Sequence, residues 1–371
     1  ECTQKSFDFP AVKRRKIEAN FDGGDITSDG GVLLLRQVDQ RLGLTVAVAK
    51  VLEDDRRQAS CQHDALSLIR QRVYALALGY EDLNDHAALR QDLAIQTAVE
   101  RDTVLASTST LCRWENRADR ETAWQLHTVL VEQFIASFQR APKRLILDFD
   151  ATDDAVHGKQ EGRFFHGYYD HYCFLPLYVF CQDQLLVSYL RPSKIDGAKH
   201  AWAILALLVK RLRQTWPKVR ILFRGDSGFC RWRMLRWCER NNVDYLVGTA
   251  RNQRLNAQAK PFLQMAERAF ATTGRKQRRF HDIYYAAHRW DHRRRIIVKA
   301  EHTAKGSNPR YLVTNLRAAP KYLYDRLYCA RGDMENRIKE QQLDLFADRS
   351  SCPAWWTNQF RLLLSSLADS L

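Results

Sequence analysis

The first third of the chain repeats apolar residues at the spacing of amphipathic helices. Residues 64–79 show this period, and so do residues 121–140, with Asp119 as a candidate N-cap of the second segment. The apolar positions are Leu66, Ile69, Val73 and Leu76 in the first segment and Trp124, His127, Leu130, Phe134 and Phe138 in the second. We therefore expect residues 27–140 to be mainly helical, after a polar and basic stretch over residues 1–20 that we expect to be extended.

A cluster of Ser and Thr at residues 107–110 precedes a short helical segment at 111–117. Hydroxyl side chains cap helix N-termini, which is the simplest explanation of the cluster. The same helix carries Arg113, Asn116 and Arg117, so it can also be read as a recognition helix that enters a DNA groove. Both interpretations remain open.

After Pro142 the pattern changes to short runs of apolar and β-branched residues, which is typical of strands. The expected elements are a strand at 145–152, a hairpin of 172–181 and 185–191, a helix at 198–214, a strand at 219–223, a helix at 231–241 and a strand at 245–248. Three strands followed by alternating helices and strands predict an α/β fold, a mixed sheet with helices on both faces.

Residues 250–320 interrupt this alternation. We interpret them as a β-rich insertion with strands at 280–288, 295–300 and 311–314, followed by a long helix at 322–346. The expected division is a helical N-terminal region (1–140), a first catalytic part (141–249), the insertion (250–320) and a last catalytic part (321–371).

Charge is distributed unevenly along the chain. The net charge of the 371 residues is +15, and residues 201–300 alone hold 23 basic and six acidic side chains. A basic stretch of this kind is typical of a surface that binds a polyanion. Aromatic residues are mixed with the basic ones, at Arg231-Trp232-Arg233 and His288-Arg289-Trp290, before Arg293, Arg294 and Arg295. A solvated basic face is the simpler explanation, but the mixture favours nucleic acid as the partner.

Composition excludes several other classes of protein. Hydrophobic residues make up 45% of the chain, which is enough for a sizeable core, and no apolar run is long enough to cross a bilayer. Nine cysteines without a Cys-x-x-Cys pair favour the reducing cytoplasm. The start at Glu1 and the helical pattern that runs to the last residue are typical of a fragment.

Three acidic residues are candidates for catalysis. Asp150 ends the first strand, where Asp148 points to the same face, and Asp226 follows the strand at 219–223 in the turn Arg224-Gly225-Asp226-Ser227-Gly228. Glu335 lies on the last long helix. Each of the three acids also has a simpler structural explanation, as a helix cap, a turn residue or a member of a row of surface ion pairs.

Taken together, the three acids predict a metal site. Two acids at strand ends and one on a packing helix can bind two Mg²⁺ ions, and Mn²⁺ can replace them. Such ions stabilise the attacking and leaving oxygens of a phosphodiester reaction. His166, Asp170 and His171 lack the spacing of a closed zinc site, and no Gly-x-Ser-x-Gly or phosphate-binding loop is present.

The residues beside these acids resemble those of a known family. The chain resembles the DDE transposases of bacterial insertion sequences, the IS4-like superfamily, and most closely its IS1380 branch. The resemblance rests on residues 27–31, 78–85, 147–154, 158–169, 224–229 and 335–341. It implies a ribonuclease H-like catalytic domain with Asp150, Asp226 and Glu335 as the catalytic and metal-binding residues, and Asp150 is favoured over Asp148.

The family signature Tyr-x2-Arg-x3-Glu-x6-Lys falls on Tyr328, Arg331 and Glu335, but its last position is Gln342. Lys339 lies one turn earlier on the same helical face and can supply the missing charge. Further candidates for DNA contact are Arg224, Arg231, Arg233, Arg293 and Arg294. Trp290 is a candidate for stacking on an unpaired base, although a structural role explains it better.

The resemblance implies an enzyme that binds element ends in double-stranded DNA, cleaves them with water and joins the 3′-OH to target DNA. We expect a homodimer on DNA in the cytoplasm, associated with the nucleoid and not with a membrane. A ribonuclease H-like nuclease without strand transfer is one alternative. A DNA-binding protein without catalysis is another, which the departure at Gln342 favours.

Overall fold

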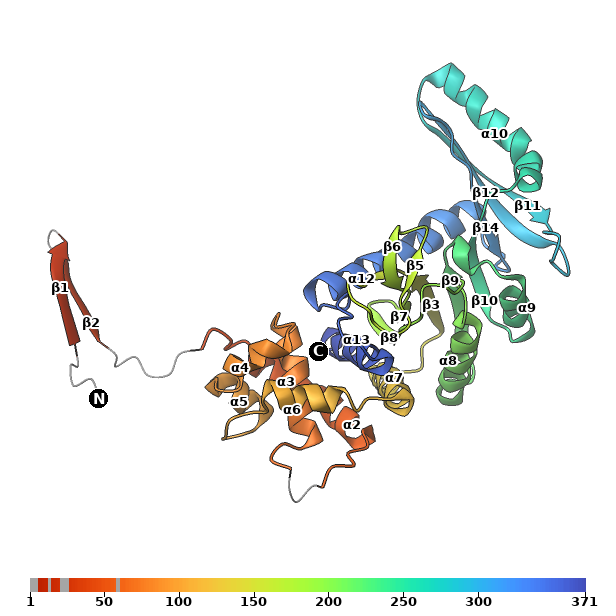
Figure 1. Ribbon diagram of the computed structural model, residues 1–371. Coiled ribbons are helices and arrows are strands. Elements are labelled where there is room, and N and C mark those ends of the chain that lie inside the picture. Colours follow the sequence, from red (N-terminus) through yellow and green to blue (C-terminus); the bar gives the residue numbers. More distant parts are fainter. Residues whose placement is uncertain (1–5, 13–14, 21–26, 58–60) are drawn as a thin grey trace.

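The computed structural model describes residues 6–12, 15–20, 27–57 and 61–371 (Figure 1). Residues 6–20 contribute two antiparallel strands, β1 (Ser6–Val12) and β2 (Arg15–Asn20), in the stretch that we expected to be extended. Residues 1–5, 13 and 14 of that stretch lie outside the described residues.

A bundle of short helices follows, as the apolar period predicts. The helices are α1 (Val32–Leu42), α2 (Leu44–Val51), α3 (Ala65–Ala77), η2 (Leu83–Asp85), α4 (His86–Leu89), α5 (Leu93–Val99), α6 (Thr108–Glu115) and α7 (Arg120–Ala136). The predicted caps are present: the Ser107 and Asp119 side chains accept hydrogen bonds from the backbone N–H groups of Thr110 and Thr122. Apolar side chains from these helices form a core around α3.

A mixed sheet forms the centre of the part of the chain that follows α7 (Figure 1). Its first five strands are β3 (Arg144–Ala151), β7 (Leu177–Cys181), β8 (Gln184–Tyr189), β9 (Arg220–Gly225) and β10 (Asp244–Thr249). The order is β10-β9-β3-β7-β8, in which β3, β9 and β10 are parallel and β7 is antiparallel to both of its neighbours. This is the ribonuclease H-like arrangement, which confirms the expected fold class.

Helices cover both faces of the sheet because side chains alternate along each strand. Leu145, Leu147 and Phe149 of β3 pack on the face covered by α7, α8 (Ala201–Thr215) and α9 (Trp232–Arg240). The opposite face packs against residues 323–338 and helix α13 (Trp355–Asp369). Ile146, Asp148 and Asp150 alternate with the first set and therefore point toward this second face.

The expected β-rich insertion at residues 250–320 contains the expected strands and, before them, a long helix that we did not expect. The segment begins with a 21-residue helix, α10 (Gln253–Thr273), which buries only Leu255, Ala259 and Ala266. That apolar stripe is too narrow to stand out in the sequence, and Pro261 lies inside the helix. The strands that follow extend the central sheet as β14-β12-β11, with β13 paired to β12. Their bounds are β11 (Gln277–Tyr285), β12 (Arg294–Thr303), β13 (Gly306–Ser307) and β14 (Arg310–Thr314).

The helix expected at 322–346 is present but irregular. It begins as α11 (Pro320–Tyr322), continues as a π-helix (Leu323–Tyr328) and a 3₁₀ turn (Cys329–Arg331), and becomes regular in α12 (Gly332–Asp344). Changes of helical pitch like these often occur at functional sites.

The single strand expected at 172–181 is divided into two strands in the structure. β6 (His171–Phe174) and β7 are separated at Leu175 and Pro176, because proline has no N–H for a sheet ladder. β6 pairs instead with β4 (Asp154–Ala155) and β5 (Phe164–His166) in a separate three-stranded sheet.

Candidate active site

Asp150 and Asp226 lie at the ends of neighbouring parallel strands. β3 and β9 pair in parallel up to Phe149 and Gly225; Asp150 is the next residue of β3, and Asp226 directly follows the last residue of β9. Asp226 also caps a short 3₁₀ turn, where its Oδ1 accepts a hydrogen bond of 2.8 Å from the Gly228 N–H. The carboxyl ends of both strands therefore bring these side chains to one edge of the sheet.

Glu335 reaches the same edge from α12 through an arginine. The Arg331 guanidinium donates to Asp150 Oδ2 over 3.2 Å and also to the Glu335 carboxylate, one turn further along the helix. Arg331 is well buried, with 13% of its side chain exposed, whereas 48% of the Glu335 side chain is exposed. One cation thus connects the acid on the strand with the acid on the helix.

Burial disfavours the charge on Asp150. It raises the pKa of this carboxyl to about 6, and the negative charges of Asp226 and Glu335 add to the effect, while Arg331 opposes it. Both of the other acids are therefore close enough to act on Asp150 electrostatically. A carboxyl group whose ionised form is destabilised by burial in this way is typical of a functional site.

Tyr328 completes this edge. Its hydroxyl lies so close to Gly248 of β10 that a Cβ there would approach it to 2.9 Å and the Ser227 nitrogen to 2.8 Å. Burial raises the pKa of the Tyr328 hydroxyl, and the charge of Asp226 contributes in the same direction. Gly248 is therefore needed for the close approach of Tyr328 to the turn that carries Asp226.

The donor set of the three acids fits a hard divalent cation, because it consists of carboxylate oxygens whose combined negative charge Arg331 offsets in part. In the part of the chain that the structure describes, however, no group of three or more His, Cys, Asp or Glu side chains is gathered closely enough to hold a metal ion. Arg331 pairs with the oxygens that such an ion would take.

Two of the expected DNA-binding arginines are buried. The Arg224 guanidinium pairs with both oxygens of Asp148, one of them at 2.5 Å, and also donates to the Leu327 carbonyl. Arg294 is 3% exposed and pairs with Glu239 and Asp291. These contacts correct the expectation, because both side chains hold neighbouring elements together instead of facing solvent.

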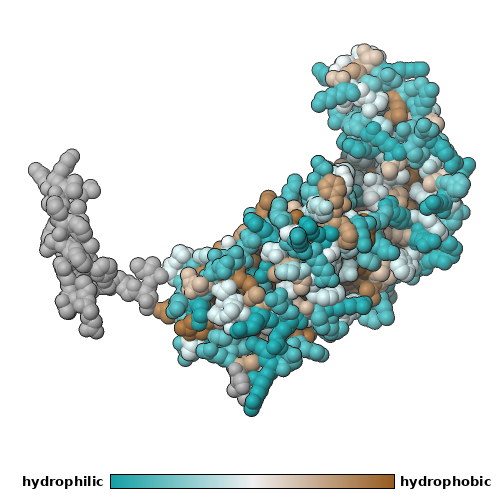
Figure 2. All heavy atoms as spheres, in the orientation of Figure 1, coloured by the Kyte–Doolittle hydropathy of each residue, from teal (hydrophilic) through white to brown (hydrophobic). Residues whose placement is uncertain are grey.

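The remaining basic candidates lie on the surface. Arg233, Arg293 and Lys339 are exposed, and Arg231 is about half exposed although it pairs with Asp196 at 2.6 Å. Figure 2 shows that hydrophilic residues cover most of the arm formed by α10, β11 and β12. Trp290 is half-buried and packs edge-on against Tyr285 at a ring distance of 5.8 Å, beneath the Arg294 guanidinium.

Gln342, where the family signature has Lys, lies near this edge. Its side-chain amide donates to the backbone carbonyl of Asp153 over 3.1 Å, three residues beyond Asp150. Lys339 is exposed on the same helix. Position 342 therefore anchors the loop that follows the first acid.

Sequence reasoning missed one pair beside the acids. His171 of β6 lies 2.9 Å from Asp153, and burial raises the pKa of the adjacent Tyr169 to about 12, with the charges of Asp153 and Asp150 contributing. The cluster of His166, Asp170 and His171 was a visible signal, but as a zinc site it lacked the right spacing.

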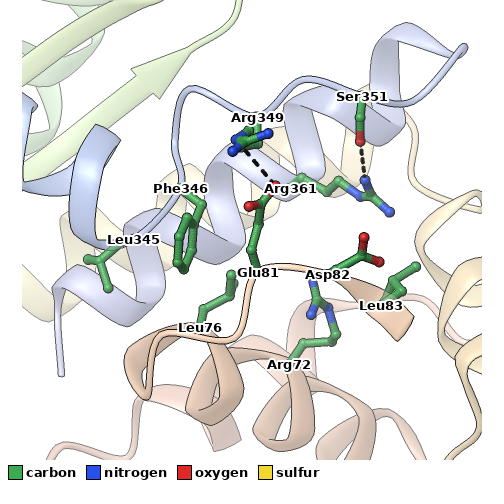
Figure 3. Close-up of a pocket in the computed structure, with 10 residues that line it drawn as sticks. All are labelled: Arg72, Leu76, Glu81, Asp82, Leu83, Leu345, Phe346, Arg349, Ser351 and Arg361. Carbon is green, nitrogen blue, oxygen red and sulfur yellow. Dashed lines mark hydrogen bonds and ion pairs between the residues drawn. The ribbon is translucent and has the colours of Figure 1, made fainter. Parts of the chain in front are cut away.

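A partly open cavity of about 60 Å³ lies between the helical region and the last segment of the chain, and none of the three acids lines it (Figure 3). Arg72, Arg349 and Arg361 line it together with acidic and apolar residues. Arg349 pairs with Glu81 at 3.5 Å, and Arg361 donates to Ser351 over 2.9 Å. With these partners the cavity belongs to a structural junction.

Two of the three polar side chains on the segment proposed as a recognition helix have partners within the protein. Asn116 accepts a hydrogen bond of 3.1 Å from Thr357 of α13, and Arg117 pairs with Asp55, while Arg113 is exposed.

Over the residues with described positions, no helix is both long and apolar enough to span a membrane.

Comparisons with known proteins give one similar structure and one matching family. The structure is similar to a piggyBac transposase solved by cryo-EM in a synaptic complex with hairpin DNA, with a TM-score of 0.42 and 10% sequence identity over 91% of this chain and 80% of that one. No curated protein matches the sequence. The family model described as transposase DDE domain group 1 matches residues 9–371. Because this match spans nearly the whole chain, the protein belongs to the DDE transposases of that group.

Proposed function

We propose that this chain is a DNA transposase of the IS4-like superfamily, in its IS1380 branch, that cleaves the ends of an insertion sequence and joins the freed 3′-OH to target DNA. The observation that supports this best is the convergence of Asp150 and Asp226 at adjacent strand ends, with Glu335 linked to Asp150 through Arg331. Family membership supports the same class of chemistry.

Asp150, Asp226 and Glu335 are the residues that would hold Mg²⁺, or Mn²⁺ in its place. Bound there, divalent ions would offset negative charge on the reacting phosphate and on the attacking and leaving oxygens. Arg331 must release at least one carboxylate for this, and its guanidinium is then free to contact a phosphate. The Tyr328 hydroxyl lies beside the Asp226 turn and orients the same phosphate.

We assign DNA binding to three parts of the chain. The helical N-terminal region recognises the element ends, and the insertion at 250–320, with exposed Arg293, contacts the DNA backbone. Exposed Arg231 and Arg233 at the start of α9, and exposed Lys339 on α12, add positive charge to the elements that follow Asp226 or carry Glu335. A homodimer on double-stranded DNA follows from the need to hold two ends together.

The test is the substitution Asp226→Asn. We expect Mg²⁺-dependent strand cleavage to fall to the uncatalysed level while DNA affinity stays nearly unchanged, because the amide keeps the shape but loses the charge. Asp183→Asn is the matched control, since this exposed acid lies in the β7–β8 turn at the opposite edge of the sheet. Cleavage by the Asp226→Asn protein at the wild-type rate would refute the assignment.

A protein that binds DNA without catalysis is a second candidate, favoured by the pairing of Arg331 with both Asp150 and Glu335. A metal titration separates the two. A transposase shows cleavage that rises with Mg²⁺ or Mn²⁺, whereas the binding protein shows no metal dependence. A strand-transfer assay with pre-cut ends then distinguishes a transposase from a nuclease that only hydrolyses.

A further inference from the structure

A small sheet beside the acids exposes aromatic side chains. Strands β4, β5 and β6, with the turns between them, occupy residues 154–174, which we call the aromatic lobe. Within it the exposed fractions are 85% for Tyr168, 53% for Phe165 and 48% for Tyr172. The Phe165 and Tyr172 rings meet edge to face at 5.7 Å. Exposed rings in contact with one another are unusual on a surface that meets only water.

The aromatic lobe is held firmly to the rest of the molecule. The Glu161 N–H donates to the Pro353 carbonyl over 2.9 Å, and Ser193 donates to the Phe164 carbonyl over 2.8 Å. Gly162, with φ at +80°, lies against the Trp355 ring, so closely that a Cβ would approach the ring to 2.6 Å. The exposed rings therefore stand on a fixed base.

Cations accompany these rings. The Arg163 guanidinium lies 4.6 Å from the centre of the Tyr172 ring, and the Lys194 ammonium lies 4.3 Å from that of Phe164. Lys159 is exposed on the same segment, while the Glu161 carboxylate accepts from the Trp355 N–H over 3.2 Å. Exposed rings with positive charge beside them are complementary to nucleobases on a phosphate backbone.

The aromatic lobe is continuous with the acid edge. It follows the first acid after only three residues, and the pair Asp153–His171 joins the start of the segment to β6. The charge of Asp150 contributes to the raised pKa of Tyr169, the neighbour of Tyr168 in a T-shaped contact at 5.0 Å. A strand of DNA that leaves the acids on this side therefore meets the rings next.

We propose that the aromatic lobe binds single-stranded DNA, with Phe165, Tyr168 and Tyr172 stacking on unpaired bases and Arg163, Lys159 and Lys194 contacting the phosphates. This rests on the proposed function, because it assigns a path to the strand that is cut at the acids. Stacking needs no particular base, since every base has an aromatic face. Neither the charge pattern nor the family match assigns this role to these residues.

The test compares the wild type with a Phe165→Ala/Tyr168→Ala double variant, in EDTA so that no cleavage occurs. The probes are a 20-nucleotide oligothymidine strand with one 2-aminopurine and a 20-base-pair duplex of mixed sequence. We expect the double variant to bind the single strand about 10- to 100-fold more weakly and to lose the quenching of 2-aminopurine, with unchanged affinity for the duplex. Trp124→Ala, a ring of 52% exposure on α7, is the matched control.

Equal single-strand affinity and equal quenching in the wild type and the double variant would overturn the inference. Loss of self-association by the variant in sedimentation, with single-strand binding intact, would also overturn it and identify a protein interface. Because the assay needs no metal and no cleavage, its result is independent of the Asp226→Asn test. Failure of one therefore does not imply failure of the other.

Discussion

Two acids on one strand, pointing to the same face, have different roles. Asp148 is 3% exposed and its carboxylate is occupied by Arg224, whereas the Asp150 carboxylate accepts one hydrogen bond from the Ala151 N–H and one from Arg331. The first pair joins β3 to β9 and to the π-helix through the Leu327 carbonyl. Asp150 is therefore the residue of this strand that can exchange its partner for a ligand, as the resemblance implies.

Substitution of these two acids should change stability in opposite directions. Asp150→Asn should raise the free energy of unfolding at pH 7.5 without metal by roughly 1–3 kcal/mol, because the folded state no longer holds a carboxylate whose pKa is raised to about 6. Asp148→Asn should lower it by about 3–5 kcal/mol, because a buried guanidinium loses its anion. Urea unfolding measures both.

The direction of the Asp150 pKa shift determines how the stability of the folded state depends on pH. The folded pKa lies above the usual value of 3.8, so the wild type gains stability as pH falls through 6 toward 4. The difference between Asp150→Asn and the wild type should therefore shrink over this interval. A difference that stays constant from pH 7.5 to 4 would contradict the raised pKa.

Cleavage should have its own pH dependence. We expect the rate to fall as pH drops through about 6, because protonated Asp150 cannot act as a metal ligand. Metal and protons compete for this carboxylate, so the midpoint should move to lower pH as the Mg²⁺ concentration rises. Initial rates across pH 5–8 at two Mg²⁺ concentrations test this, and a midpoint independent of Mg²⁺ would count against Asp150 as a ligand.

At the scale of elements, helix α13 connects the helical region to the central sheet. Its apolar residues Phe360, Leu363 and Leu367 belong to the core around α3, while Gln359 donates to the Ser188 carbonyl of β8 over 3.0 Å. Beside it, Glu115 of α6 pairs with Arg72 of α3 at 2.7 Å and with Arg361 of α13 at 2.8 Å. The cavity of Figure 3 lies along this junction.

Loss of the Glu115 ion pairs at this junction should destabilise the folded protein. Glu115→Gln removes the anion between two arginines, of which Arg72 is 2% exposed, so we expect unfolding free energy to fall by about 3–5 kcal/mol. The matched control is Glu132→Gln, because Glu132 pairs with Arg211 at 2.5 Å on the surface and its loss should cost at most about 1 kcal/mol. Equal effects of the two substitutions in urea unfolding would show that the junction is not stabilising.

At the scale of the whole molecule, most of the excess positive charge lies on residues 201–300, which include two strands of the central sheet and the arm that extends it. Residues 201–300 hold 23 basic side chains, but the structure divides them into two groups. Arg224 and Arg294 are buried in ion pairs, whereas Arg233 and Arg293 face solvent. Only the exposed group can release counterions from DNA.

DNA affinity should therefore depend on salt through the exposed arginines. For a 20-base-pair duplex, the double variant Arg233→Gln/Arg293→Gln should reduce the slope of log affinity against log salt by about 2, since each phosphate contact contributes roughly 0.9. Arg140→Gln, an exposed residue before β3, is the control and should leave the slope unchanged. An unchanged slope in the double variant would exclude these residues from the DNA interface.

Local patterns in the sequence determined much of this description. Helices α3 and α7, the Asp119 cap of α7 and the first five strands of the central sheet have clear local patterns, so each could be recognised from the sequence. The acids Asp150 and Asp226 could be placed at strand ends for the same reason. Helix α10 could not be recognised, because it buries three small or medium side chains and is otherwise polar.

Tertiary structure alone decided which charged residues are available. Arg224 and Leu327 are 103 residues apart, and Asp150 and Arg331 are 181 apart, so no local pattern could show that these pairs meet. The sequence by itself determined the types of element and the net charge of each segment, because both follow from residues that are close together in the chain. The burial of a charge and its partner depend on how distant segments pack, and this decided that Arg224 supports the sheet while Arg331 lies between two of the acids.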